Sequence, residues 1–385
     1  FVDGVRVHGT VSMPSLRVVR IAETVLVPCE NVDAIESPLV RDDGWVMGSR
    51  LRQVLAVIER EARTSSTLLI RGETGTGKEQ AARAFHAFGP HAKGPFVAVN
   101  CAAIPEGLAE RLLFGAKRGA YSGASTDAVG HLQNADGGVL FLDEGVELDL
   151  SVQAKLLRVL ETQEVIPLGA SHGVRVQVRV CIATHGDLRA AVAEGRFRAD
   201  LYHRIAPPEV VLPPLRDRLD EIAHHVTAEI AGIGLAEAET GLERLTAHAA
   251  LVETCLVRAW PGNVRELRKE VRHAASVARA KKSDRVRLDC LSPNAGHPFE
   301  GEPRSRTPSP AAPSLAAGST AIATDTSGQR RGYKKWSKSI SRAELERALA
   351  ENAGNVAIAA RSLGMQRTQM YREMTRWSVK RPTRG

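Results

Sequence analysis

Four zones follow one another along the 385-residue chain, each with its own spacing of apolar and polar positions. Residues 1–28 hold short alternating apolar stretches around a glycine turn, which predict β-strands. Residues 47–290 alternate apolar runs of strand length with stripes of helical period, a pattern typical of an α/β domain on a parallel sheet. Residues 291–335 are rich in Pro, Ser, Gly, Ala and Thr, a composition that predicts a flexible linker. Residues 336–385 return to helical periodicity.

These changes of pattern give the expected domain boundaries. The strand-like N-terminal segment is followed by a short linker, then by the α/β domain and a more helical extension of it, and finally by the flexible linker and an all-α module. The six segments are 1–28, 29–46, 47–221, 222–290, 291–335 and 336–385.

The composition is that of an ordinary globular protein, with 43% apolar and 25% charged residues. No apolar stretch approaches the roughly 20 residues that span a bilayer, and no signal peptide is visible, which indicates a cytoplasmic protein without a membrane partner. The five cysteines are scattered without a CxxC pair, which favours small core residues over disulfides or a cysteine-rich zinc site. The chain begins with Phe1, not methionine, which indicates a piece of a longer protein.

Positive charge gathers at the C-terminal end. The formal net charge is +8, but residues 330–385 hold 14 Lys and Arg against 4 Asp and Glu, so the rest of the chain is close to neutral. A basic module on a near-neutral body is the electrostatic footprint of a nucleic-acid-binding domain. A solvated basic tail would have the same charge, so charge alone leaves both interpretations open.

A glycine-rich loop stands between a predicted strand at 68–70 and a predicted helix at 81–85. Such a loop can curl its backbone N–H groups around phosphate oxygens at the positive end of a helix. Lys78 would then reach the terminal phosphates of a nucleotide. A glycine-rich surface turn is the alternative interpretation. The strand before the loop and the helix after it favour a phosphate-binding loop, because a surface turn does not need them. The loop reads Gly72, Glu73, Thr74, Gly75, Thr76, Gly77, Lys78, Glu79.

Two adjacent carboxylates end a strongly apolar strand about 65 residues further along. The strand 139–142 is followed by Asp143 and Glu144, at the edge where open α/β sheets place their ligands. Asp143 would hold Mg²⁺, and Glu144 would polarise the water that attacks ATP. Because Glu79 stands where a Ser or Thr usually binds the metal, Mg²⁺ must rely on other ligands.

Five further segments stand at intervals along the same domain. In chain order they are PFVAVNC at 95–101, LFG at 113–115 with GAYSGA at 119–124, RVCIATH at 179–185, FRADLYHR at 197–204 with LPPLRDR at 212–218, and WPGNVREL at 260–267. Together with the GETGTGKE loop, they resemble the AAA+ sigma-54 activators, the NtrC-like enhancer-binding proteins. The resemblance covers residues 47–290 and about 340–377, and it implies an AAA+ P-loop ATPase fold with a helical lid.

The resemblance assigns roles around the nucleotide. Asn100 would restrain Glu144 in a nucleotide-dependent switch, and Thr184 would lie near the γ-phosphate. Arg265 would reach back from the lid to sense hydrolysis. Family members often have Asn where His185 stands, so a sensing and a purely structural role for His185 both stay open.

Two arginines of the FRADLYHR segment resemble the family's arginine fingers. Arg198 and Arg204 would project into the ATP site of a neighbouring subunit, a kind of contact that contributes about 10³–10⁵ in rate in other NTPases. An ordinary pair of arginines on a helix surface would show the same spacing. The finger interpretation implies an oligomeric ring, which in this family is usually a hexamer.

The GAYSGA segment is similar to the family's GAFTGA loop, which contacts sigma-54. Its small residues suit a mobile tip that carries one aromatic contact group. Tyr121 keeps the ring of the usual Phe, whereas Ser122 lacks the methyl group of the usual Thr. The loss of this methyl group puts productive coupling to sigma-54 in question. The loop is Gly119, Ala120, Tyr121, Ser122, Gly123, Ala124.

The C-terminal module is predicted to hold a helix-turn-helix. A capping box at 341–344 starts one helix, Gly354 and Asn355 turn the chain into a second, and Gly364 separates a third. The arrangement resembles the Fis-type DNA-binding domain of the same family, and a packing or dimerising bundle is the alternative. The exposed face of the recognition helix would carry Arg367, Thr368, Gln369 and Arg372 against double-stranded DNA upstream of a promoter.

The N-terminal strands resemble the last third of a forkhead-associated (FHA) domain, a fold that binds phosphothreonine peptides. The phosphate-binding residues of that family would precede Phe1, so no phosphopeptide site can be assigned. Intact, such a domain would connect the protein to a phosphothreonine-bearing partner.

The sequence therefore predicts an ATP-hydrolysing activator that binds upstream DNA and remodels sigma-54 RNA polymerase into the open complex. Two alternatives stay open. One is a DNA-binding regulator that keeps the fold but no longer engages sigma-54, and the other is an AAA+ remodeller of a different protein.

Overall fold

The computed structural model describes residues 1–8, 16–28, 40–42, 45–105, 107–121, 125–235, 245–298 and 347. The chain divides into two compact units, Phe1–Ser305 and Arg306–Gly385. All but one of the described residues belong to the first unit. The predicted helix-turn-helix at 336–385 lies, apart from that residue, outside the described part.

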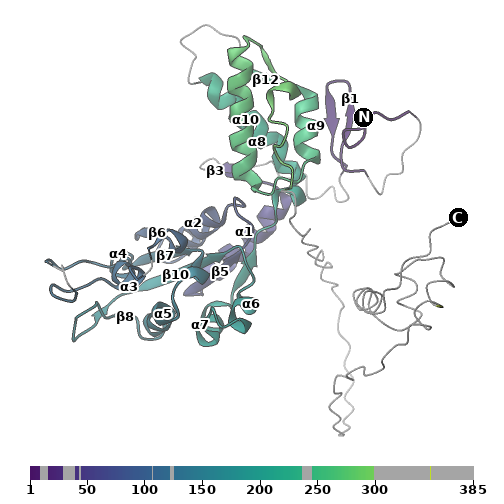
Figure 1. Ribbon diagram of the computed structural model, residues 1–385. Coiled ribbons are helices and arrows are strands. Elements are labelled where there is room, and N and C mark those ends of the chain that lie inside the picture. The colour runs from purple at the N-terminus through teal and green to yellow at the C-terminus, as the bar shows by residue number, and fades with distance from the viewer. Residues whose placement is uncertain are drawn as a thin grey trace. The chain divides into compact units, whose positions relative to one another are not determined.

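A five-stranded parallel sheet forms the centre of the first unit (Figure 1). Because the strands are parallel, their carboxyl ends meet at one edge, which brings together segments that are far apart in the sequence. The strand order is β11, β5, β10, β7, β6, with bounds Thr67–Arg71 (β5), Phe96–Asn100 (β6), Gly138–Asp143 (β7), Val178–Thr184 (β10) and Glu209–Val211 (β11).

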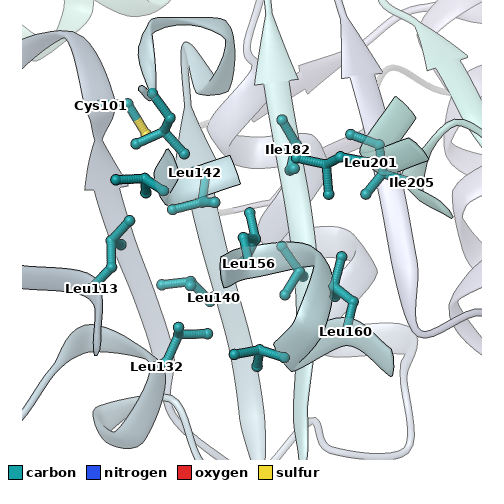
Figure 2. Close-up of a cluster of buried hydrophobic side chains, with 14 of the residues drawn as sticks. Cys101, Leu113, Leu132, Leu140, Leu142, Leu156, Leu160, Ile182, Leu201 and Ile205 are labelled. Carbon is teal, nitrogen blue, oxygen red and sulfur yellow. The ribbon is translucent and has the colours of Figure 1, made fainter. Parts of the chain in front are cut away.

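Apolar side chains from successive strand positions enter two different cores. Leu140 and Leu142 of β7 lie with Ile182 of β10 in one buried cluster (Figure 2). Phe141 of β7 and Cys181 of β10 lie in the cluster on the opposite face. Since neighbouring residues of a strand point to opposite faces, a strand that is covered on both sides must be apolar throughout.

Helices cover both faces of the sheet, so the predicted α/β fold class is confirmed. One face is covered by α1 (Ser49–Ala62) and α2 (Lys78–Phe88). The other is covered mainly by α3 (Ala109–Phe114), α4 (His131–Asn134), α5 (Leu150–Thr162), α6 (Leu188–Ala193) and α7 (Ala199–Ile205).

A helical subdomain follows the sheet in the sequence and has its own core. The indole of Trp260 is fully buried in this core, and its Nε1 donates to Cys255 O at 2.6 Å. We call this subdomain the lid. It consists of α8 (Leu219–Leu235), α9 (Ala249–Val257), α10 (Asn263–Ala280) and the short parallel pair β12 (Thr246–Ala247) and β13 (Arg285–Val286).

The N-terminal residues form an antiparallel hairpin of β1 (Val19–Ile21) and β2 (Thr24–Leu26), which lies beside α9 (Figure 1). Val18 is fully buried in the core of the lid, and Arg20 forms an ion pair with the buried Glu253 of α9. The strand-forming segment predicted at 1–28 is therefore packed against the lid.

Two further antiparallel pairs complete the described elements. β3 (Val40–Asp42) and β4 (Trp45–Met47) form a hairpin at the end of the segment expected to be a linker, where buried Val46 lies next to the start of the α/β domain. β8 (Glu164–Val165) pairs with β9 (Val174–Arg175).

Four of the five cysteines lie in the described part of the chain, where all four are buried and free, as core residues would be. Burial raises the pKa of the Cys101 and Cys255 thiols to about 12. Among the described helices, none is long and apolar enough to cross a membrane.

Candidate nucleotide-binding site

A cleft of about 670 Å³ lies between the carboxyl edge of the sheet and the lid. The loop after β5 and the carboxylates that end β7 line one side, and residues of α8 and α10 line the other. The cleft thus brings together Lys78, Asp143, Glu144 and Arg265, which the sequence analysis selected from three separate segments.

The loop after β5 has the backbone conformation that its glycines permit. Gly75 and Gly77 have φ angles of +77° and +104°, in a region that residues with a side chain rarely adopt. Gly77 is also the N-cap of α2, so the positive end of that helix faces the cleft. Lys78 begins α2, and its Nζ donates to Gly72 O at 3.0 Å. This arrangement can hold an anion such as a polyphosphate.

Asp143 ends β7 with a carboxylate oxygen that has no hydrogen-bond partner. Its Oδ1 is buried and unpaired, and burial raises the pKa of the carboxyl group. Buried polar atoms are rarely left unpaired, so an oxygen of this kind fits a divalent cation bound with a nucleotide. No group of three or more His, Cys, Asp or Glu side chains that could hold a metal by itself occurs in the described part of the chain. Mg²⁺ would therefore share its ligands between Asp143, phosphate oxygens and water.

Glu144 lies beside Asp143 in a strained backbone conformation. Its φ angle is +53°, which is uncommon for a residue with a side chain. Its carboxylate lies 3.4 Å from Lys78 Nζ and 2.7 Å from His185 Nδ1. Burial alone would raise the pKa of Glu144, but the hydrogen bond with His185 and the charge of Lys78 hold it below its usual range. The group is therefore ionised at neutral pH, as a base that polarises water must be.

Two predicted sensing residues form hydrogen bonds with neighbouring backbone groups in this structure. Asn100 lines the cleft, but its Oδ1 accepts from the backbone N–H of Ala102 at 3.1 Å. The hydroxyl of Thr184 accepts from Gly186 N and does not line the cleft. His185, for which the sequence left a structural role open, contacts the Glu144 carboxylate on the oxygen that Lys78 does not approach.

The remaining side chains of the phosphate loop are held by neighbouring residues. The carboxylate of Glu73 pairs with both terminal nitrogens of Arg216, and this hydrogen bonding lowers the pKa of Glu73. Thr76 Oγ1 donates to Glu73 O at 2.8 Å. Glu79 lines the rim of the cleft and forms an ion pair with Arg83 one helical turn away.

A buried asparagine connects this loop to the lid. Asn263, which begins α10, donates from Nδ2 to Glu73 Oε2 and to Thr74 O, at 3.1 and 3.0 Å. Its Oδ1 accepts from Leu215 N at 2.7 Å. The sequence analysis contained Asn263 only within the WPGNVREL segment at 260–267 and gave it no role of its own.

Sequence reasoning also assigned no role to three further residues that line the cleft. Arg218 is 1% exposed, pairs with Glu221 and donates to Thr76 O at 3.3 Å. His225 of α8 and Trp45 of β4 line the same region. Arg218 ends the LPPLRDR segment, to which the sequence analysis assigned no role. No local motif marks His225 or Trp45, because they come from two elements that only the fold brings together.

The two predicted arginine fingers lie away from this chain's own cleft. Arg198 precedes α7 and pairs with Asp200, and Arg204 near the end of α7 donates to Leu160 O at 2.9 Å. Neither lines the cleft, and both are exposed or half-buried. The assignment of these two arginines as fingers therefore stays a prediction.

The residues on either side of the predicted sigma-54 loop are hydrogen-bonded to each other. Ala116 and Ala128 exchange backbone hydrogen bonds, and Lys117 forms an ion pair with Asp127. Tyr121 is 37% exposed, and the guanidinium of Arg111 lies 5.0 Å from the centre of its ring. Gly119, Ala120 and Tyr121 are described, whereas Ser122, Gly123 and Ala124 lie outside the described residues, as do the DNA-contact residues predicted at Arg367, Thr368, Gln369 and Arg372.

Two family models match the chain. Residues 46–211 match the sigma-54 interaction domain, and residues 338–377 match the bacterial regulatory protein, Fis family. The second match falls on the segment where the sequence predicted a Fis-type helix-turn-helix.

Curated proteins of known function are similar over most of the described part. The chain is 41% identical over 240 residues to the Nif-specific regulatory protein of Herbaspirillum seropedicae, covering 62% of this chain and 44% of that protein. It is 45% identical over 226 residues to the DNA-binding transcriptional regulator NtrC of Salmonella typhimurium, covering 58% and 47%. It is 38% identical over 333 residues to the anaerobic nitric oxide reductase transcription regulator NorR of Salmonella newport, covering 86% and 62%.

The chain thus spans about half the length of the curated relatives it matches. Among solved structures, the ATP complex of NtrX from Brucella abortus is similar with a TM-score of 0.57 and 30% identity, covering 86% of this chain and 68% of that one. The sigma-54 interaction domain and the Fis-type module are thus both matched in this chain. The chain belongs to the family of NtrC-like regulators that carry a sigma-54 interaction domain followed by a Fis-type helix-turn-helix.

Proposed function

We propose that this protein is a sigma-54-dependent transcriptional activator that couples ATP hydrolysis to the remodelling of RNA polymerase. The observation that carries the proposal is the cleft in which the phosphate loop, the Asp143–Glu144 pair and the lid meet, in a chain that matches the sigma-54 interaction domain. A binding-only module would not need an ionised carboxylate beside the metal-binding position.

The proposed chemistry follows from the residues of the cleft. ATP binds with its phosphates on the loop around Gly75 and Lys78, and Asp143 holds Mg²⁺, which neutralises phosphate charge. Glu144 orients and polarises the attacking water. Arg265, a residue of the lid, senses the loss of the γ-phosphate after hydrolysis. The similar NtrX of Brucella abortus has been solved in complex with ATP, which supports nucleotide binding by this fold.

An oligomeric ring completes the proposed site. Arg198 and Arg204 lie outside this chain's cleft, so their contribution to charge stabilisation requires a second subunit. The ring we propose is the hexamer usual in this family, and hydrolysis within it moves the loop 119–124 against sigma-54. The Fis-type module holds the assembly on upstream DNA in the cytoplasm, with Arg367, Thr368, Gln369 and Arg372 on the recognition helix.

The test is a binding experiment between the purified protein and sigma-54, with ADP and a metal fluoride that mimics the transferred phosphate. A complex that forms only with this nucleotide state supports both the chemistry and the target. The Ser122→Thr variant is run beside the natural chain. If only that variant binds, the chain is a regulator with a weakened sigma-54 contact. If neither binds while ATP is hydrolysed, the protein remodels a different partner.

A phosphothreonine-bearing partner of the N-terminal segment is a separate proposal, which rests on the FHA resemblance of residues 1–28. The test is binding of the intact gene product to a library of phosphothreonine peptides. Failure to retain any of them removes the FHA assignment and leaves the ATPase proposal untouched.

A further inference from the structure

A glutamine is fully buried among the apolar side chains that cover one face of the sheet. Gln153 lies on α5 and is 0% exposed, and Leu156 and Leu160 of the same helix belong to the core shown in Figure 2. A buried amide costs free energy unless its polar atoms are hydrogen-bonded, whereas an apolar side chain would fill the space without that requirement. The partners of the amide therefore indicate what Gln153 does.

Both ends of the Gln153 amide bond to backbone groups. Nε2 donates to Leu148 O at 2.7 Å and to Arg196 O at 3.1 Å, and Oε1 accepts from Arg198 N at 2.9 Å. The orientation of the amide follows from these partners, because two are carbonyls and the third is an N–H group. The bond to Leu148, which lies just before α5, holds the amide so that its oxygen faces the backbone of Arg198.

The backbone that Gln153 holds is the segment that leads into α7. Arg198 is the N-cap of α7, and Phe197 before it is buried in the same core. The segment is thus fixed by the apolar contacts of Phe197 and by the hydrogen bonds of Gln153. The guanidinium of Arg198 reaches the surface, where it pairs with Asp200. The place from which this side chain extends is therefore set from inside the core.

The second predicted finger is held by the same helix. Arg204 donates from Nη2 to Leu160 O at 2.9 Å. Gln153 and Leu160 are about two helical turns apart on α5, so they lie on the same side of that helix. α5 therefore supports both arginines, one through a side-chain amide and the other through a backbone carbonyl.

We propose that Gln153 is the positioning residue for Arg198, because its amide fixes the backbone from which that arginine extends into the nucleotide site of a neighbouring subunit. The inference rests on the proposed shared site and adds to it a residue that acts through the finger and not on its own subunit's nucleotide. A finger contributes about 10³–10⁵ in rate, and a misplacement of about 1 Å costs about 10²-fold. Loss of Gln153 should therefore slow hydrolysis in the neighbour.

The test uses mixtures of full-chain variants in which one subunit supplies the finger and the other supplies the site. Lys78→Ala subunits cannot bind ATP and supply only fingers, whereas Arg198→Ala subunits keep their site and lack the finger. Hydrolysis by the mixture therefore measures a finger that acts on a neighbour. Gln153→Met keeps the length of the side chain and removes its hydrogen bonds. Placed in the Lys78→Ala subunit, it should lower hydrolysis by about tenfold to 10²-fold.

The same change in the Arg198→Ala subunit should leave hydrolysis by the mixture unchanged, because that subunit supplies no Arg198. A defect of folding would act from either position, so this asymmetry separates positioning from a structural role. Val152→Ala is the matched control. Val152 is the adjacent residue on α5, is 2% exposed and lies in the same core, so its truncation removes packing but no hydrogen bond. It should have no effect from either position, and thermal denaturation and ATP titration establish that each variant is folded.

Two results would overturn the inference in different ways. If Gln153→Met lowers hydrolysis equally from both positions, or from neither, Gln153 only supports the fold and the inference is wrong, while the shared site stands. If Lys78→Ala and Arg198→Ala restore no hydrolysis even without Gln153→Met, the subunits share no site. The proposed ring then fails, and the inference fails with it.

Discussion

The imidazole of His185 lies against the carboxylate of Glu144, with 2.7 Å between His185 Nδ1 and Glu144 Oε2. The backbone N–H of His185 also donates to Oε2, at 3.3 Å. β10, which ends just before His185, and β7, which ends just before Glu144, are neighbours in the sheet, and this pairing brings the two residues together. The contact orients a carboxylate whose own backbone is strained.

Removing this contact should slow hydrolysis without weakening ATP binding. We expect His185→Ala to lower kcat by about tenfold with little change in KM for ATP, because a poorly oriented base polarises water less well. His185→Asn, which can still donate a hydrogen bond, should recover part of kcat. Steady-state ATPase measurements check this, with the exposed His172→Ala as control. An unchanged kcat in His185→Ala would show that the contact has no part in orienting Glu144.

Removing the charge of Glu144 should separate binding from hydrolysis. In Glu144→Gln we expect kcat to fall by at least about 10²-fold, the usual contribution of a positioned base, while ATP affinity is retained. Single-turnover hydrolysis and calorimetric titration measure the two quantities. Equal losses of both would mean that Glu144 holds the nucleotide and not the water.

The arginine-finger proposal predicts complementation between inactive subunits. Lys78→Ala should abolish ATP binding, and Arg198→Ala should leave binding intact but reduce hydrolysis by about 10³-fold or more. Mixing the two variants should restore part of the activity, because a Lys78→Ala subunit can supply its arginine to a neighbour's intact site. Arg204→Ala is tested in the same way. Mixtures with no more activity than the separate variants would argue against a site shared between subunits.

The ion pair between Arg20 and Glu253 should matter for the stability of the lid. The two side chains are 13% and 4% exposed, so replacing one partner leaves the other buried without its counter-charge. We expect Arg20→Ala to lower the free energy of unfolding by about 3 kcal/mol. Urea denaturation measures this change. Arg60→Ala, which breaks an exposed pair with Glu61, should cost less than about 1 kcal/mol. Similar values for both variants would mean that the N-terminal hairpin adds little to the lid.

The pairing of Glu73 with Arg216 predicts a specific acid dependence. Since Arg216 lowers the pKa of Glu73 in the folded state, the pair contributes stability above the unfolded value of 4.5 and loses it as the pH falls through the folded pKa. Arg216→Met should therefore destabilise the protein at neutral pH and flatten the loss of stability below pH 4.5. Denaturation midpoints across this range check the prediction. If Arg216→Met lowers the denaturation midpoint by the same amount at every pH, titration of Glu73 has no role. The control is Arg83→Met, which breaks the exposed pair with Glu79.

Local patterns in the sequence were enough to locate the phosphate end of the cleft. Lys78 follows a strand and begins a helix, and Asp143 ends an apolar strand, so each residue's place depends on its near neighbours along the chain. The parallel sheet then follows from the alternation of strands and helices, because its carboxyl edge must gather the strand ends. For these residues, sequence periodicity and the geometry of a parallel sheet determine the arrangement.

The lid end of the cleft was decided by tertiary packing alone. Asn263 contacts Glu73, which is 190 positions away, and His225 lines the cleft only because α8 packs against α10 and β4. The partner of Glu144 was likewise settled when β10 was placed beside β7, which put His185 against the carboxylate and left Asn100 with Ala102. Periodicity reports which face of an element is buried, but not which distant polar group it meets, since that depends on the packing of elements that share no local sequence.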